Sequence, residues 1–501
     1  MGTAASAQSA FHPPIAYATG ASPQCVVSTD FDGDGDRDIA ITVRNPARLS
    51  LLRNLGDGTF AAPEFTALAA SSDPSGLVAR DFNADGHPDL VVGLRGLDSI
   101  QYLRNLGDGH FAYGITVAVG HLPHSLTAGD FDRDGDEDLA VTNGGDGSVS
   151  IVKNLGNGVF ASFQSLFVGL TARGIAVGRF SAPVGGAPLA SLDLVVAVHD
   201  LRKLTFLRNA GDGSFSVGSS IAMGSPTSPE RPEDVAVADF DLDGRDDVVA
   251  SLSDTTVQDV GLFLQTAPGV FAPIDYFHSG GTHPAGIAVV DFDRDMLVDV
   301  AVVNSLDNTL GVLRNVGGGL FAPVQTYALL GPVSEFITLA DFDGNAYCDI
   351  VVTNGLGNSA SVLLSTLENP RPYCVAAPNS AGPGAHIGAT GSVSVAADDL
   401  ILNVTGAPAS VNGLFFLSQT SIEYPFYAGN LCLGMPRARL GPTLVTDSLG
   451  NAARPLGIQQ QWSAAMITPD SVWNFQFWYR DPTGPNGFAN FSDALRVVFS
   501  N

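Results

Sequence analysis

The sequence predicts an all-β protein: a seven-bladed β-propeller followed by a small antiparallel β-sandwich domain. Three observations predict this fold. A unit of about fifty residues recurs seven times in the first three quarters of the chain, each unit combines strand-like segments with Gly- and Asp-rich turns, and the recurrence stops near residue 368. Repeats of this period with four short strands each are typical of propeller blades.

Each unit begins with the segment Asp-Phe-Asp or a variant of it, flanked on both sides by short apolar strands. A third strand ends in Leu-Arg-Asn and leads through Gly-Asp-Gly to a phenylalanine in 52–60, 103–111 and 207–215. Asp-Gly between strands is a strong hairpin signal because a type I′ turn needs positive φ at both central residues. A fourth, more variable strand follows. The units begin at Asp30, Asp81, Asp130, Arg179, Asp239, Asp291 and Asp341.

The same pattern sets the expected domain boundaries. We expect a flexible tail over 1–10, the propeller over 11–368, a Pro-containing linker over 369–372 and the β-sandwich over 373–501. The seventh unit stops without its fourth strand, and residues 11–20 look like such a strand without the three before it. We therefore expect 11–20 to close the last blade, which removes exposed sheet edges. A linear array of seven hairpin modules is the alternative, and it leaves 11–20 unexplained.

Composition excludes several function classes. The chain has 51 acidic and 24 basic residues, a formal charge of −27 that disfavours nucleic acid and anionic membranes as partners. No apolar run approaches the roughly 18–20 residues that span a bilayer. The first ten residues lack the basic and apolar regions of an intact secretory signal. Motifs of serine hydrolases, zinc proteases and P-loop enzymes are absent.

The Asp-rich loop at the start of each unit has the spacing of a cation site. Counted from its first aspartate, the loop of unit one carries carboxylates at positions 1, 3, 5 and 9, with Gly35 at position 6. Calcium takes about six to eight oxygen ligands. The side chains at every second position of the loop and the backbone carbonyl at position 7 can supply them. Four carboxylates in nine residues repel one another unless a cation neutralises them. A solvated turn is the alternative for one loop, but six copies in register disfavour it.

We expect the residues at positions 1, 3, 5, 7 and 9 to bind the ion. They are Asp30, Asp32, Asp34, Asp36 and Asp38 in unit one; Asp81, Asn83, Asp85, His87 and Asp89 in unit two; Asp130, Asp132, Asp134, Asp136 and Asp138 in unit three; Asp239, Asp241, Asp243, Arg245 and Asp247 in unit five; Asp291, Asp293, Asp295, Leu297 and Asp299 in unit six; and Asp341, Asp343, Asn345, Tyr347 and Asp349 in unit seven. Met296 and Ala346 replace the glycine in units six and seven, and unit four lacks these ligands. We expect about four strong calcium sites, two weaker ones and one empty unit.

These units resemble FG-GAP/VCBS repeats, the calcium-binding blades of integrin-α-type seven-bladed propellers and of many secreted bacterial proteins. The resemblance covers about residues 11–367 and rests on the Asp-x-Asp-x-Asp-Gly-x-x-Asp loops and Gly-Asp-Gly-x-Phe turns. It implies a secreted, extracellular or cell-surface setting, calcium between the first two strands of a blade, and a role in adhesion, ligand binding or scaffolding. The C-terminal part is similar to a β domain of secreted, repeat-bearing bacterial proteins.

The C-terminal domain contains an aromatic strand with two distinct faces. Alternation places Trp473, Phe475, Phe477 and Tyr479 on one face, which we expect in the core, and Trp478 on the other. A sugar-stacking platform is the alternative for the first set. Cys374 and Cys432 share this domain and can pair in a disulfide. Cys25 and Cys348 are expected at opposite ends of adjacent blades, beyond the roughly 7 Å Cα limit for a disulfide.

Together, these features predict a secreted, non-enzymatic, calcium-dependent propeller that binds or scaffolds an extracellular protein or glycan surface. Its partner can also be a second copy of the chain, in an oligomer or polymer. The alternative is a carbohydrate-binding lectin or, with less support, a polysaccharide lyase. A ligand would meet the polar rim formed by the residues six positions before each loop, although a solvated rim is the simpler interpretation. The rim comprises Gln24, Ser75, His124, Arg173, Glu233, Ala285 and Glu335, with His121 and His283 nearby.

Overall fold

Strands dominate the described part of the chain, and in the repeat region they pair in antiparallel sets of four. The computed structural model describes residues 10–182, 191–223, 230–253, 259–295, 297–345, 347–366, 371–373, 379–381, 384–395, 397–419, 421–426, 429–433, 437–457, 467–468, 471–481 and 489–499. The chain forms two compact units, one of residues 1–343 and 347–365 and the other of residues 366–501 with the short segment 344–346. The expected tail, apart from Ala10, lies outside the described residues, as do Met296, Ala346 and Cys374.

The first unit contains seven four-stranded sheets within the described ranges. They are β2 (Ala21–Thr29), β3 (Asp38–Asn45), β4 (Arg48–Leu52) and β5 (Glu64–Ala67); β6 (Pro74–Arg80), β7 (Asp89–Leu94), β8 (Ser99–Asn105) and β9 (Phe111–Ala118); β10 (Pro123–Gly129), β11 (Asp138–Asn143), β12 (Ser148–Val152) and β13 (Gln164–Phe167); β14 (Ala172–Gly178), β15 (Asp193–Val198), β16 (Lys203–Asn209) and β17 (Phe215–Ala222); β18 (Arg231–Ala238), β19 (Asp247–Ser253), β20 (Val260–Phe263) and β23 (Asp275–Phe277); β24 (Pro284–Val290), β25 (Asp299–Asn304), β26 (Thr309–Leu313) and β27 (Gln325–Ala328); and β28 (Ser334–Ala340), β29 (Asp349–Asn354), β30 (Ser359–Leu363) and β1 (Ile15–Ala18). A short 3₁₀ turn, η1 (Arg95–Leu97), and a two-stranded hairpin of β21 (Gln265–Ala267) and β22 (Val270–Phe271) complete this unit as described.

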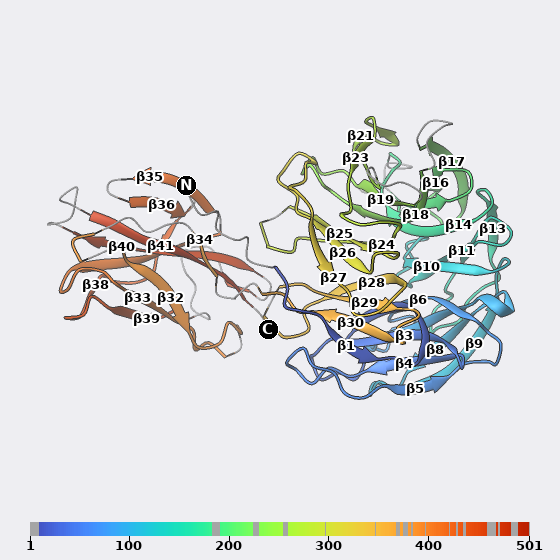
Figure 1. Ribbon diagram of the computed structural model, residues 1–501, viewed down its shortest axis with the longest axis horizontal. Coiled ribbons are helices and arrows are strands. Elements are labelled where there is room, and N and C mark those ends of the chain that lie inside the picture. Colours follow the sequence, from blue (N-terminus) through green and yellow to red (C-terminus); the bar gives the residue numbers. More distant parts are fainter. Residues whose placement is uncertain are drawn as a thin grey trace. The chain divides into compact units, whose positions relative to one another are not determined.

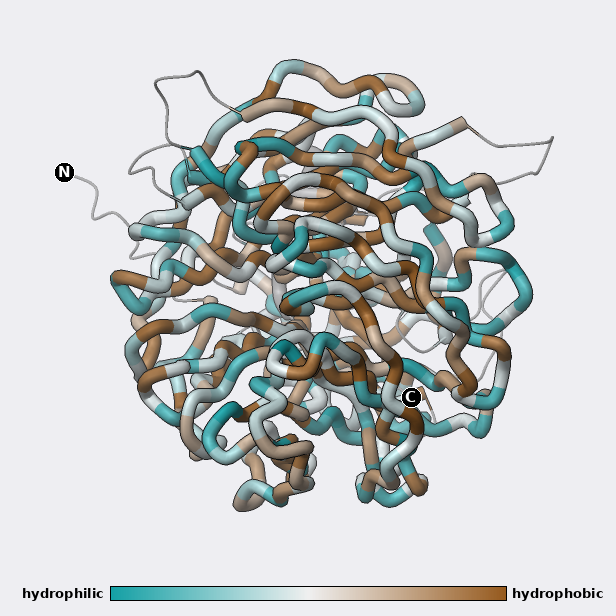
Figure 2. Tube along the Cα trace, turned by 90° about the vertical axis from the view of Figure 1, so that its right-hand side faces the viewer, coloured by the Kyte–Doolittle hydropathy of each residue, from teal (hydrophilic) through white to brown (hydrophobic). Residues whose placement is uncertain are grey.

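The sheets form a closed ring. The first strand of each sheet contacts the first strand of the next, from β2 through β6, β10, β14, β18 and β24 to β28, and β28 in turn contacts β2. Figure 1 shows these sheets arranged around a common centre. The second strands are buried on both faces, as in β7, where all six residues are buried. Fourth strands such as β5 are largely exposed. Figure 2 shows hydrophobic and hydrophilic stretches alternating along the chain.

The N-terminal segment supplies the outer strand of the last sheet. Strand β1 pairs antiparallel with β30, from Ile15 opposite Val362 to Ala18 opposite Ser359. A further bridge joins Phe11 to Ser365. The Phe11 ring is buried and lies edge-on to Phe292 and Tyr327, with ring centroids 5.7 and 5.3 Å apart. Residues from the two ends of the repeat region therefore share one sheet and one hydrophobic cluster.

Phenylalanines from neighbouring sheets pack in pairs between the blades. The phenylalanine at position 2 of an acidic loop meets the phenylalanine that follows the Gly-rich turn of the next unit. Phe131 and Phe215 are such a pair, with ring centroids 5.2 Å apart at 88°. The corresponding pair across the ring closure joins Phe342 of the last acidic loop to Phe60 of the first repeat, with ring centroids 5.4 Å apart. The Gly-x-Phe turns thus serve packing between sheets as well as chain reversal.

The second unit is built from two larger sheets and a hairpin. Its described strands are β31 (Arg371–Tyr373), β32 (His386–Thr390), β33 (Ile401–Thr405), β34 (Asn412–Ser418), β35 (Ser421–Phe426), β36 (Gly429–Leu433), β37 (Ala438–Arg439), β38 (Leu444–Val445), β39 (Ala452–Pro455), β40 (Val472–Arg480) and β41 (Ala489–Val498). One sheet has the order β31-β41-β40-β34-β37, with β38 also paired to β34; a second has the order β32-β33-β39; and β35 pairs with β36. Residues 371 and 372, expected in a linker, instead begin β31, because their backbone pairs with β41.

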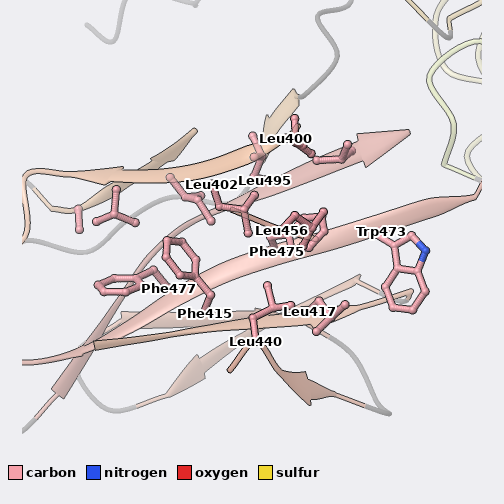
Figure 3. Close-up of a cluster of buried hydrophobic side chains, with 14 of the residues drawn as sticks. Leu400, Leu402, Phe415, Leu417, Leu440, Leu456, Trp473, Phe475, Phe477 and Leu495 are labelled. Atoms are coloured by element: carbon pink, nitrogen blue, oxygen red, sulfur yellow. The ribbon is translucent and has the colours of Figure 1, made fainter. Parts of the chain in front are cut away.

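One hydrophobic core joins the two larger sheets. Leu402 of β33 and Phe415 of β34 belong to the same buried cluster as Phe475 and Phe477 of β40. Figure 3 shows these side chains gathered between the strands that carry them. Trp473, Phe475, Phe477 and Tyr479 are all buried there, as their alternation predicts. The opposite face is partly buried too, since the Gln476 amide bonds to the backbone of Cys432 and Ser492.

The cysteines fall into two classes. Cys432 forms a disulfide, and its expected partner, Cys374, lies outside the described residues. Cys25 and Cys348 are free thiols, as expected from their separate places in the ring. Burial raises the pKa of each of these two thiols to about 12, so both stay protonated at neutral pH. In the part of the chain that the structure describes, no helix is long and apolar enough to cross a membrane.

The displaced N-terminal segment yields the first prediction. Replacing Phe11 with alanine removes the ring that packs on Phe292 and Tyr327, so the free energy of unfolding should fall by about 3–5 kcal/mol. Urea denaturation followed by fluorescence measures the change. Phe167→Ala is the matched control, because Phe167 is 66% exposed in another outer strand. Equal stability of the two variants would contradict a stabilising contribution of the N-terminal segment to the ring.

Candidate functional site: acidic loops and axial cavity

Each acidic loop joins the first strand of a sheet to the second and is shaped by its own carboxylates. The carboxylate at position 1 accepts hydrogen bonds from backbone N–H groups further along the loop. Asp81 accepts them from Asp85 and Gly86 at 3.2 and 2.8 Å, and Asp239 accepts them from Asp243 and Gly244 at 3.1 and 2.8 Å. Gly86 has a φ of +89°, a left-handed conformation that favours glycine at position 6.

Within the described residues, five loops bring three carboxylates close enough to share one ion. In each set, one oxygen per residue lies within 4.8 Å of the others. The sets are Asp30, Asp32 and Asp38; Asp130, Asp132 and Asp134; Asp239, Asp241 and Asp243; Asp291, Asp293 and Asp295; and Asp341, Asp343 and Asp349. The loop of unit two has the same turn, but Asn83 occupies position 3, where its amide donates to the Tyr102 hydroxyl at 3.2 Å. Units six and seven gather carboxylates despite lacking the position-6 glycine.

Position 3 is partly neutralised by a basic residue from the third strand or its end. Lys153 Nζ lies 3.0 Å from Asp132 Oδ2, and Arg53 Nη1 lies 2.5 Å from Asp32 Oδ2. Arg314 forms the corresponding ion pair with Asp293. In units one, three and six, the Arg or Lys that precedes the asparagine therefore pairs with the acidic loop, a role not predicted from the sequence.

The second oxygen of two of these carboxylates has no partner. Oδ1 of Asp132 and Oδ1 of Asp293 are buried and accept no hydrogen bond, although Oδ2 of each is paired. An unsatisfied buried acceptor costs about 1–3 kcal/mol. Both residues belong to the carboxylate sets, so a bound cation would supply the missing partner. Because the donors are all oxygen, they fit a hard cation such as calcium or magnesium rather than zinc or copper.

The aspartate at position 9 has a different role from the others. It is buried in all seven sheets, including the one whose loop lost the other ligands: Asp38, Asp89, Asp138, Asp193, Asp247, Asp299 and Asp349. In Asp138, Oδ2 accepts from the backbone N–H of Phe131 and Oδ1 from that of Asn154, at 3.1 and 2.7 Å. Asp299 repeats this with Phe292 and Asn315. Each position-9 carboxylate therefore ties its loop to the end of the third strand.

The residue at the end of the third strand that donates this backbone hydrogen bond also reaches the preceding sheet. Asn154 donates from Nδ2 to the backbone carbonyl of Phe82, at 2.8 Å, and Asn315 donates to Phe240 at 2.9 Å. In six sheets an Asn or Gln makes such a bond: Asn54, Asn105, Asn154, Asn209, Gln265 and Asn315. We call this combination of a position-9 aspartate with that Asn or Gln the blade latch. It joins neighbouring sheets beside every acidic loop but one.

The blade latch changes the interpretation of the expected ligands. Position 9 belongs to the carboxylate sets only in units one and seven, whereas units three, five and six use positions 1, 3 and 5. Burial raises the pKa of Asp299 to about 7 and of Asp349 to about 8, although both accept two backbone hydrogen bonds. The signal for a structural role was present in unit four, which keeps Asp193 after losing the other carboxylates.

The residues at position 7 lie just after the turn, and their side chains serve varied purposes. The Arg245 guanidinium donates from Nε to the backbone carbonyl of Gln265 at 2.7 Å and pairs with Asp243. Tyr347 is fully buried. Such variety is expected if only the backbone at this position matters. The strengths that we expect for individual sites stay predictions.

An axial cavity of about 520 Å³ lies among the first strands of the sheets. All seven residues of the expected polar rim line it: Gln24, Ser75, His124, Arg173, Glu233, Ala285 and Glu335. His283 also lines it, whereas His121 does not, since His121 instead pairs with Asp98 at 3.0 Å. Arg44, near the end of β3, and Arg95, at the start of η1, add two positive charges that were not predicted from the sequence. Both follow a position-9 aspartate by six residues, which is the sequence signal for them.

Charges in the cavity are unevenly distributed around the ring. The first and fourth sheets of the ring contribute Arg44 and Arg173, and Arg95 directly follows β7 of the second sheet. The fifth and seventh sheets contribute Glu233 and Glu335. Arg173 pairs with Glu233, which also meets His199 at 3.1 Å. Burial raises the pKa of Glu335, and burial together with the nearby arginines lowers the pKa of His124 to about 4. The cavity is thus a polar, partly charged hollow of a size suited to a small ligand.

A closed ring of four-stranded antiparallel sheets with acidic loops between first and second strands defines a β-propeller. A family model described as FG-GAP-like repeat matches residues 30–92, 81–141, 191–250 and 291–352. These four matches, each containing an acidic loop and the strand after it, support an FG-GAP repeat β-propeller. No curated protein matches the chain.

Solved structures resemble the chain in fold. Crystal structures of BBS1N in complex with ARL6DN, one soaked with mercury and one with lead, match with TM-scores of 0.51 and 0.50 at 15% and 14% identity. Both matches cover 71% of this chain and 97% of the other. A lectin from Agrocybe aegerita that recognises non-reducing terminal N-acetylglucosamine has a TM-score of 0.44 and 20% identity, over 61% of this chain and 80% of that one. At such identities the likeness concerns the fold alone.

The axial cavity yields a pH prediction. The pKa of His124 is lower in the folded state than its ordinary value of 6.5, so below that value the unfolded chain binds a proton that the folded one does not. Stability should therefore fall as pH drops from 6.5 towards 4, with His124 contributing about 2 kcal/mol of the loss at pH 5. In His124→Gln this part of the slope should vanish, as measured by urea denaturation at several pH values. His110→Gln is the control, since His110 is exposed. Identical slopes in all three proteins would refute a neutral buried His124.

Proposed function

We propose that the protein is a secreted, calcium-binding seven-bladed β-propeller with a C-terminal β-sandwich domain, acting as an extracellular binding or structural scaffold rather than as an enzyme. The seven sheets are its blades, and the two larger sheets of the second unit are its sandwich. The observation that carries the proposal is the set of five loops in which three carboxylates lie within 4.8 Å of one another. Calcium at these loops stabilises the scaffold on which partners bind.

Electrostatics support a cation at the loops. Carboxylates this close repel one another, and a basic partner reaches only one oxygen of Asp132 and of Asp293. With about 43 acidic and 18 basic residues before Thr366, the first unit also carries most of the −27 charge of the chain. Calcium outside cells is at about millimolar concentration, which suits sites of moderate affinity. The residues that would hold it are the side chains of the five sets.

A structural role for the metal is favoured over a catalytic one. The loop carboxylates are held by backbone N–H groups of the same loop and occur at equivalent positions around the ring. A bound ion would therefore fix the turn that connects the first two strands of a blade. Because such an ion binds only the folded state, it would raise stability by mass action. Binding of partners then falls to other surfaces, of which the axial cavity is one.

Calcium binding can be tested by metal removal combined with a single-loop variant. Calcium at about 1 mM should raise the melting temperature, and a chelator should lower it, because ligands of the native state stabilise it. The variant Asp130→Asn/Asp134→Asn should bind one calcium ion fewer by native mass spectrometry. Asp57→Asn is the matched control, since Asp57 lies outside the acidic loops on an exposed hairpin turn. An unchanged melting temperature on chelation, with no bound ions, would overturn the proposal.

A further inference from the structure

The second unit carries a groove on the face of its larger sheet that points away from the core. The groove has a volume of about 620 Å³, and strands β34, β36, β37, β40 and β41 contribute to its lining. Its central polar and aromatic residues are Phe416, Arg437, Arg439, Gln476, Trp478 and Arg480. These residues lie up to about sixty positions apart in the chain, and only the pairing of β34 with β37 and β40 brings them together.

The groove is basic in a strongly acidic protein. Three arginines line it, and no acidic side chain does among the residues that the structure describes. From Thr366 on, the chain has six arginines and eight acidic residues, so half of the basic groups of this unit converge on one groove. Among the described residues, neither Arg439 nor Arg480 forms an ion pair. Guanidinium groups gathered in a hollow are suited to a multivalent anion, which they hold through charge-assisted hydrogen bonds.

Two aromatic residues, Phe416 and Trp478, help to line the groove. Trp478 is half-buried and pairs with Leu414 of β34, while Phe416 pairs with Gln476. The Arg439 guanidinium lies over the Phe416 ring, 6.0 Å from its centroid. Gln476 is fully buried and both ends of its amide are hydrogen-bonded, so it holds β40 in place under the groove. A ligand would therefore meet a groove whose central strand is held in place by hydrogen bonds.

We propose that this groove binds an acidic carbohydrate chain, with its carboxylate or sulfate groups on Arg437, Arg439 and Arg480 and one sugar ring against Trp478. The volume suits a ligand of a few rings, since small-molecule sites span roughly 300–1,000 Å³. The indole ring provides an apolar face and the arginines provide the anion contacts. The acidic loops of a second copy are a weaker candidate, because the proposed calcium ions would occupy their carboxylates. This site adds a specific ligand class to the proposed scaffold role and does not depend on calcium.

Titration with defined oligosaccharides tests the groove. We expect hexasaccharides of galacturonate or of heparin to bind the full chain, with neutral maltohexaose as the comparison; the two acidic probes separate carboxylate from sulfate recognition. Isothermal titration calorimetry at low salt gives the affinity. Each of Arg439→Gln and Arg480→Gln should weaken binding about tenfold or more, because a hydrogen bond to a charged group contributes roughly 1.5–3 kcal/mol. Arg104→Gln is the charge-matched control, since Arg104 is exposed in the first unit.

Tryptophan fluorescence provides a second measurement. Bound oligosaccharide should change the emission of the native protein, and Trp478→Phe should abolish that change while near-ultraviolet circular dichroism shows the fold intact. Calcium binding by native mass spectrometry should be unaltered in every groove variant, so failure here is separable from failure of the calcium sites. The proposal is overturned if neutral and acidic probes behave alike or neither binds at millimolar concentration. It is also overturned if Arg480→Gln abolishes self-association of a protein that binds no oligosaccharide, since the occupant is then a second copy.

Discussion

The buried aspartate at position 9 of each repeat is the constraint on which the rest of the ring depends. Its two oxygens hold the start of the acidic loop and the end of the third strand, and the adjoining Asn or Gln reaches the preceding sheet in six cases. Burying a carboxylate is costly unless its oxygens are hydrogen-bonded. The backbone must therefore present N–H groups at both places, which specifies the loop entry and the register of the sheet together. The phenylalanine pairs between blades pack beside this network.

The nine residues of each acidic loop thus have two different roles, one in the fold and one in gathering the carboxylates of a candidate metal site. Position 9 serves mainly the fold, while positions 1, 3 and 5 gather charge at the surface of the same turn. The cost of gathering it is reduced by backbone N–H groups and by Lys153, Arg53 and Arg314. Hydrogen bonds within the loop thus fix its turn, and a bound cation would supply a partner for the unpaired oxygens of Asp132 and Asp293. A repeat can lose its ion-binding residues, as unit four has done, and keep its place in the ring.

Much of the first unit could be predicted from the sequence because its information is local and repeated. The loop starts, the Gly-rich turns and the displaced strand at 11–20 all follow from period and turn chemistry. The blade latch could not be predicted from the sequence, since spacing alone does not distinguish a carboxylate that binds backbone N–H groups from one that binds a metal ion. The place of Arg44 and Arg95 in the lining of the axial cavity was not predicted, because it depends on how different sheets meet. In the second unit, the alternation from Trp473 to Tyr479 predicted the core, whereas the groove beside Trp478 required knowledge of which strands pair.

Amide hydrogen exchange measured with and without calcium tests this account most directly. Latch amides, such as the backbone N–H groups of Asn54, Asn154 and Asn315 that donate to a position-9 aspartate, should exchange slowly in both conditions. Turn amides, such as those of Gly35 and Gly86, should exchange quickly without calcium and slow down when it is added. If removal of calcium makes the latch amides exchange as fast as the turn amides, the ring depends on the ion and not on the buried carboxylates, and the account is wrong.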